Sequence, residues 1–147
     1  MWQRGLTLLE CLVALGIVAI LTALATPSLF GQLNAARALN GAHQIYAAVQ
    51  YARSMAQTLD TVVTLCPRSS KADATTLCGG HFGESLVAYQ ESANGPRILQ
   101  IWSPLSGVVV RNRSGLDPVT GEIQWHPDGI GGRNVTLSVC AGGHNWA

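Results

Sequence analysis

The chain is organised around an N-terminal stretch that reads Gly5-Leu6-Thr7-Leu8-Leu9-Glu10 and continues directly into an apolar segment. From Leu6 to Thr26, Glu10 is the only residue with a formal charge. A helix of about 20 such residues, at roughly 1.5 Å per residue, is about 30 Å long, which is the hydrocarbon thickness of a bilayer. The sequence therefore predicts one membrane-spanning helix over residues 6–27.

A short polar leader, residues 1–5, precedes this helix and carries one positive charge, at Arg4. A secretory signal peptide has a longer charged region, a shorter apolar core and a cleavage site after that core. Here the expected cleavage site follows Gly5 and lies before the apolar run. We expect cleavage at this point to leave the membrane helix on the mature protein.

Glu10 is costly inside a membrane, because a carboxylate at the bilayer centre costs on the order of 2.5–3.5 kcal/mol without a partner. Cleavage after Gly5 would give Leu6 a free α-amino group, and Glu10 lies four residues further on, on the same helix face. Glu10 can then pair with this amino group, in its own chain or in a neighbouring subunit. The alternative is an ordinary single-span anchor with Glu10 in the interfacial layer, where the cost is small.

These residues resemble the class III (prepilin-type) leader of type IV pilins and type II secretion pseudopilins. The resemblance implies that a prepilin peptidase/methyltransferase cleaves between Gly5 and Leu6 and N-methylates Leu6, and that Glu10 is needed for assembly. Leu6 departs from the commoner Phe or Met at this position. The resemblance also implies a single-pass protein of the bacterial inner membrane with a periplasmic C-terminal domain, which then enters a pilus or pseudopilus.

Length and composition leave room for one globular domain beside the anchor. The chain has 147 residues, so about 90–120 residues remain for that domain. The net charge of the whole chain is +1, which gives no gross electrostatic attraction to nucleic acid or acidic partners. Four cysteines on an exported chain indicate oxidation outside the cytoplasm. Cys11 lies in the apolar helix, where we expect a small buried hydrophobe.

Beyond Pro27, apolar residues recur at helical spacing, as at Leu29, Leu33 and Ala36. Residues 28–60 are therefore predicted to form the amphipathic outer half of one long helix. Composition and turn signals predict strands at 61–66, 85–89, 97–102, 108–111, 122–125 and 134–140.

The last of these strands alternates cleanly, with Val135, Leu137 and Val139 on one face. The expected fold class is α+β: a long N-terminal helix packed on an antiparallel β-sheet domain, as in type IV pilins. The expected division of the chain is a leader at 1–5, a membrane and filament-core helix at 6–27, an amphipathic half-helix at 28–60 and a β-rich periplasmic domain at 61–147.

Two further motifs are similar to the GspH/FimT branch of this family: Tyr51-Ala52-Arg53-Ser54-x-Ala56 before a β-branched strand, and Trp125-x-Pro127-x-Gly129 before the last strand. The resemblance implies a minor pilin or pseudopilin, a low-copy subunit that primes or caps a filament and contacts other pilins through its N-terminal helix. The chain lacks the basic residues that the branch commonly has between helix and first strand, and it lacks a Gly-Arg-rich tail. The choice between pilus and type II secretion stays open.

The soluble part contains three cysteines, an odd number. Cys66 and Cys78 enclose a short polar loop, and our first prediction is a disulfide between them, which contributes roughly 3 kcal/mol in the chain-entropy model. The alternative is Cys66–Cys140; in the preferred pairing Cys140 is buried and free. No cysteine pair has the two-to-four-residue spacing of a structural zinc site. No metal, cofactor or catalytic motif is expected, so the chain is not predicted to be an enzyme.

Basic residues suggest a second class of function. Arg111 and Arg113 lie two residues apart at a strand end, and Arg133 precedes the final strand. If the strands bring them together, they can bind DNA phosphates, as in a minor pilin that acts in DNA uptake during transformation. The alternative is a solvated rim of the sheet. We expect DNA binding to be weak, because three arginines release few counterions.

Overall fold

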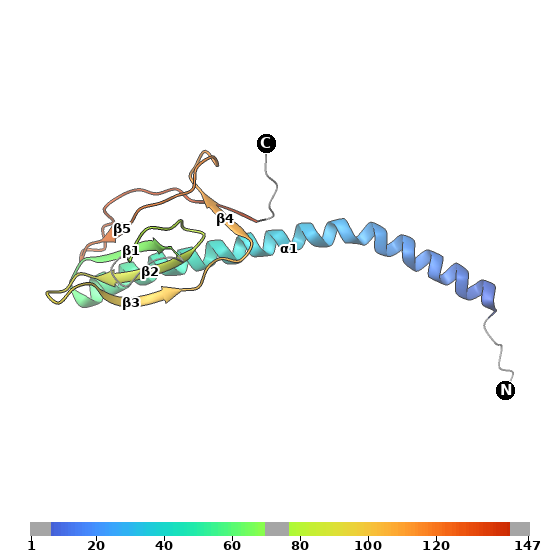
Figure 1. Cartoon of the computed structure of the whole chain (residues 1–147), viewed down its shortest axis with the longest axis horizontal. Helices are drawn as coiled ribbons and strands as arrows, with labels where there is room; N and C mark the ends of the chain where they lie inside the picture. The colour runs from blue at the N-terminus through green and yellow to red at the C-terminus, as the bar shows by residue number, and fades with distance from the viewer. Residues whose placement is uncertain (1–6, 70–76, 142–147) are drawn as a thin grey trace, which may run out of the picture. The chain divides into compact units, whose positions relative to one another are not determined.

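The computed structural model describes residues 7–69 and 77–141, without the side chains of residues 24–28. The predicted cleavage and methylation positions, Gly5 and Leu6, lie outside the described residues. One long helix, α1, runs from Leu8 to Leu59 and precedes six strands (Figure 1). By contacts between backbone positions, the chain divides into two units, residues 1–36 and 37–147, which are described separately.

In the first unit, α1 exposes large apolar side chains along its whole described length. Leu8 is 80% exposed, and exposed apolar side chains occur on every face of the helix. The other exposed large apolar side chains up to residue 21 are Leu9, Leu12, Val13, Leu15, Ile17, Val18, Ile20 and Leu21. Within the described residues, no helix combines the length and the apolarity required to cross a membrane.

The other end of α1 is closed by a left-handed residue, close to the predicted helix end. Asp60 has φ 50°, and the N–H of Thr61 donates to the carbonyl of Ala56 at 3.2 Å. This bond from the second residue after the helix to its last turn is the main bond of a Schellman cap. Asp tolerates the left-handed conformation better than most residues, so the chain can reverse here and enter the sheet.

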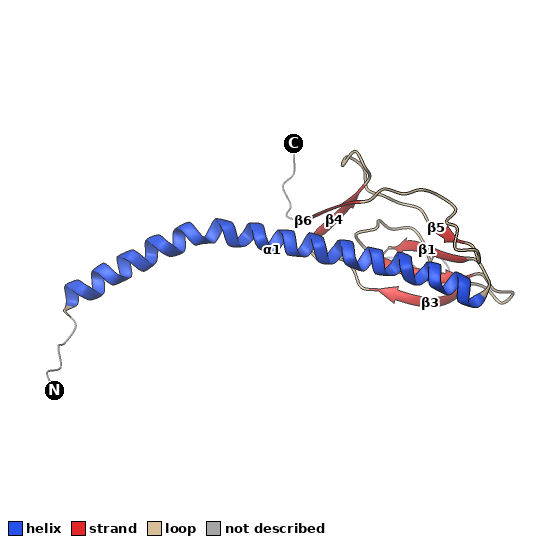
Figure 2. Cartoon of the chain, turned by 180° about the vertical axis from the view of Figure 1, so that it is seen from behind, coloured by secondary structure: helices blue, strands red, loops and turns tan. Residues whose placement is uncertain are grey.

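The strands form two antiparallel sheets rather than the single sheet that the sequence analysis expected. The larger sheet has the order β3-β2-β1-β5. The smaller one pairs β4 with β6, whose labels lie side by side in Figure 2. The strand bounds are β1 Val63–Arg68, β2 Ser85–Gln90, β3 Arg97–Trp102, β4 Val108–Arg111, β5 Ile123–Trp125 and β6 Ser138–Ala141. The predicted α+β class is confirmed, and the bounds of β3 and β4 match the prediction.

The predicted bounds of β2 and β5 differ from the structure by one residue, and those of β1 and β6 by more. β1 begins two residues later than predicted and extends through Arg68. β6 contains only the last part of the predicted strand 134–140, because its partner β4 has four residues and the chain turns immediately after it, where the N–H of Asn112 donates to the carbonyl of Asp117. The alternation in 134–137 is nevertheless informative, since Val135 and Leu137 are half-buried against the core.

The core lies between α1 and the inner face of the larger sheet. Ala48, Ala52 and Ala56 form a fully buried stripe on the helix, and Leu65 and Leu86 face it from β1 and β2. Alanine lets the helix backbone come close to the sheet, and the larger strand residues fill the remaining space. On the opposite face of the sheet, a second cluster contains Cys66, Val87 and Tyr89.

The smaller sheet reaches α1 at a glycine. A Cβ on Gly41 would lie 3.2 Å from a methyl carbon of Val108 and 3.4 Å from one of Val139. The absent side chain therefore allows β4 and β6 to approach the helix. Further along, Tyr51 packs edge-on against Trp102 with ring centroids 5.5 Å apart. These contacts fix the connection between β3 and β4 beside the helix.

Candidate functional site

The start of α1 is capped by Thr7. Its side-chain hydroxyl accepts a hydrogen bond from the backbone N–H of Glu10 at 3.3 Å, and its carbonyl accepts from Glu10 and Cys11 at 3.1 and 3.2 Å. Threonine at the N-cap and glutamate three residues later make up the sequence pattern of a capping box. The sequence analysis missed this role, although the pattern Thr7-x-x-Glu10 was visible. Glu10 thus lies in the first helical turn, where a negative charge also stabilises the helix dipole.

The predicted disulfide is confirmed. Cys66 in β1 and Cys78 are joined, with their Cα atoms 5.5 Å apart, and the alternative pairing with Cys140 was wrong. One further expectation about cysteines was wrong. Cys140 is free as predicted but exposed, because it lies on the outward side of the two-stranded sheet beside Ser138. Cys11 is exposed on α1 in the single chain, like the apolar residues around it.

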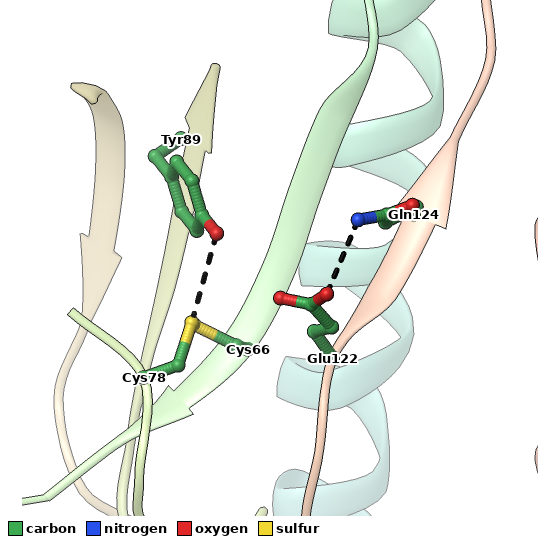
Figure 3. Close-up of a disulfide and its surroundings, with 5 residues drawn as sticks. All are labelled: Cys66, Cys78, Tyr89, Glu122 and Gln124. Atoms are coloured by element: carbon green, nitrogen blue, oxygen red, sulfur yellow. Dashed lines mark hydrogen bonds between the residues drawn. A yellow bond between two sulfur atoms is a disulfide. The ribbon is translucent and has the colours of Figure 1, made fainter. Parts of the chain in front are cut away.

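Tyr89 lies against this disulfide, as Figure 3 shows. Its hydroxyl donates to Sγ of Cys78 at 3.9 Å. Burial is the main cause that raises the pKa of Tyr89 above its ordinary value, and the carboxylate of Glu122 adds to the shift. Glu122 in turn accepts a hydrogen bond from the amide of Gln124 at 3.2 Å (Figure 3). The arrangement stabilises the outer face of the sheet.

A shallow cleft of about 280 Å³ opens beside the disulfide. Its lining consists of Cys78, Gly79, Gly80, Thr120, Gly121 and Glu122. The only ionisable side chain among them is Glu122, so the cleft contains no pair of groups for acid–base or nucleophilic catalysis. Across residues 7–69 and 77–141, no three His, Cys, Asp or Glu side chains converge as metal ligands would.

Two family models match the chain. A model described as type II transport protein GspH matches residues 41–147, which is more than half of the chain. The chain belongs to the GspH family. A model described as prokaryotic N-terminal methylation motif matches residues 3–26. No curated protein and no solved structure matched the chain.

Membership in the GspH family confirms the predicted class of function. The chain is a minor pseudopilin of type II secretion, a structural and non-enzymatic subunit that takes part in pseudopilus assembly. The methylation motif overlaps α1 up to residue 26, and the GspH match includes α1 from residue 41 onward and all the described strands.

In this GspH-family domain, the three arginines singled out from the sequence have different surroundings. Arg111 in β4 donates to the carbonyl of Leu116 at 2.6 Å. The guanidinium of Arg133 lies beside Gly121, 3.0 Å from the position that a Cβ would occupy. Arg113 is exposed in the turn after β4. No contact among the described residues gathers the three into one site, and their predicted binding to DNA stays a prediction.

Proposed function

We propose that this GspH-family chain begins as a single-pass protein of the bacterial inner membrane, with its C-terminal domain in the periplasm. A prepilin peptidase/methyltransferase cuts between Gly5 and Leu6 and N-methylates Leu6. Residues 6–27 then form the membrane anchor and later the filament-core helix, residues 28–60 its amphipathic continuation and residues 61–147 the β-rich domain. The other pseudopilins are the partners of the helix in the filament.

The match to the methylation motif over residues 3–26 is the observation that carries this proposal. The exposed apolar surface of α1 supports it, since a helix that is apolar on every face requires an apolar environment. Lipid provides this environment before assembly, and the helices of neighbouring subunits provide it afterwards. Exchange between the two environments keeps the apolar side chains out of water at each step.

Glu10 has two candidate roles in this exchange, and they require different chemistry. Pairing with the amino group of a neighbouring Leu6 requires the negative charge. Capping of α1 requires only a hydrogen-bonding side chain at the third helical position, which glutamine also supplies. Thr7 contributes to the cap and has no charge.

The test compares Glu10→Gln with Thr7→Ala in cells that assemble the pseudopilus. We expect Glu10→Gln to reach the membrane normally and to be largely absent from filaments, and Thr7→Ala to be incorporated. Mass spectrometry of the membrane-extracted protein should show an N-methylated Leu6 in both variants. Normal incorporation of Glu10→Gln would exclude the charge-pairing step, and an intact Met1 in the presence of active prepilin peptidase would exclude the processing step.

A further inference from the structure

A second cleft, of about 210 Å³, lies within the domain unit between α1 and the connection from β3 to β4. Arg37, Asn40 and Gln44 line it from the helix, and Leu105 and Ser106 line it from the connection. Val108, the first residue of β4, also lines it. The helical residues follow one another at steps of three and four and therefore share one face. We call this cleft the Arg37 cleft.

The walls of the Arg37 cleft are fixed by the surrounding contacts. The amide nitrogen of Gln44 donates to the carbonyl of Ser103 at 2.7 Å and holds the connection against the helix. Gly41, which also lines the cleft, allows Val108 to approach. The side chain of Arg37 extends toward Gly107, 3.8 Å from the position that a Cβ would take there. The cleft is thus formed by the fold of the domain alone.

The cleft is lined by a positive charge and by no negative charge. Its lining contains one cation, Arg37, and the polar side chains of Asn40, Gln44 and Ser106, but no carboxylate. Within the described part of the chain, no hydrogen bond or ion pair engages the guanidinium of Arg37. A guanidinium with neighbouring amide and hydroxyl donors matches the geometry of a carboxylate.

The size and position of the cleft indicate which kind of molecule would supply a carboxylate to it. The volume is below the 300–1,000 Å³ typical of small-molecule pockets, so the cleft suits one side chain. It also lies on α1, the helix through which we propose that the chain contacts other pseudopilins, shortly after its apolar part. We propose that the Arg37 cleft binds an aspartate or glutamate side chain of a neighbouring pseudopilin in the filament. This inference rests on the proposed entry of the chain into a pseudopilus.

A photocross-linking experiment tests the contact in the full-length protein. The probe is p-benzoylphenylalanine at position 43, in place of the exposed His43, which lies about one helical turn after Asn40 and does not line the cleft. It is introduced in cells that express the other pseudopilins of the same secretion system. We expect a cross-link to a segment of another pseudopilin that contains Asp or Glu. Arg37→Gln in the same chain should lower the yield at least about tenfold, as expected for loss of a hydrogen bond between charged groups. Arg37→Lys should restore part of it.

The matched control is Arg113→Gln, which removes an exposed arginine outside the cleft and should leave the yield unchanged. An intact Cys66–Cys78 bond and a normal membrane level show that each variant is folded. An unchanged yield in Arg37→Gln, or cross-links only to lipid, to a second copy of this chain or to a segment without a carboxylate, would overturn the proposal. Glu10→Gln separates the two hypotheses: exclusion of that variant from filaments, with no effect of Arg37→Gln, would refute the cleft and leave the assembly role intact.

Discussion

The two units of the chain use apolar residues in opposite ways. In the first unit, Leu12 and Ile17 of α1 remain 61% and 54% exposed, whereas Leu65 and Leu86 of the domain have no exposed surface. The domain therefore derives its stability from its own core. The first half of α1 contributes none of the buried core residues, and in the proposed function its apolar contacts come from lipid or from neighbouring subunits. Under this proposal, the second half of the helix supports the folded domain and the first half supports filament assembly.

The sharpest test of this contrast is a matched pair of truncations. Leu65→Ala should lower the free energy of unfolding of the domain by about 2–5 kcal/mol, because it opens a cavity in a fully buried site. Leu12→Ala should change it by less than about 0.5 kcal/mol. Urea titration of the detergent-solubilised protein, followed by near-UV circular dichroism, measures both. Equal losses would show that the two units unfold as one.

The disulfide should have the next largest effect. Replacing Cys66 and Cys78 by serine should lower the free energy of unfolding by roughly 2–4 kcal/mol, since the unfolded chain gains conformational freedom. Cys140→Ser is the control, because this thiol is free and exposed. The same urea titration applies, and a double variant as stable as the control would contradict the structural role of the bond.

The two helical glycines offer a smaller contrast. Gly41→Val should destabilise the domain by about 1–3 kcal/mol, because its side chain would collide with Val108 and Val139. Gly31→Val makes the same chemical change at a position where nothing lies within 4 Å, and it should leave the domain unaffected. Thermal unfolding of the two variants side by side decides the matter, and a stable Gly41→Val protein would refute the close approach.

The smallest effect concerns pH. Since the pKa of Tyr89 is raised in the folded state, the unfolded chain loses the phenol proton first as pH rises above its ordinary value of 10.0. The stability that this group contributes is therefore complete below pH 10 and declines above it, with a slope of at most about 1.4 kcal/mol per pH unit. Tyr89→Phe should flatten this decline, whereas Tyr46→Phe, at an exposed position, should not. Urea titrations between pH 9 and 11 compare the slopes.

Much of this architecture was predictable because it depends on local pattern. The helix, β3, β4 and the disulfide followed from periodicity, turn residues and cysteine position. The failures concern partners that sequence order does not show. Val135 and Leu137 show the alternation of a strand because they are half-buried. They are not part of β6, because β4 has only four residues and pairs with residues 138–141 alone. The exposure of Cys140 and the convergence of Arg37 with the β3–β4 connection likewise depend on tertiary packing.

The pairing of β1 with β5 has a consequence for how the subunit matures. Val63 in β1 lies opposite Trp125 in β5. The first strand to be synthesised therefore pairs with a strand that is synthesised about 60 residues later. Pairings so distant in sequence form late, after a long loop has closed. While the chain is being synthesised and exported, β1 keeps one unpaired edge until β5 arrives. A chain truncated before residue 123 lacks β5 and cannot complete the larger sheet. The larger sheet can therefore form in full only after synthesis has passed residue 125.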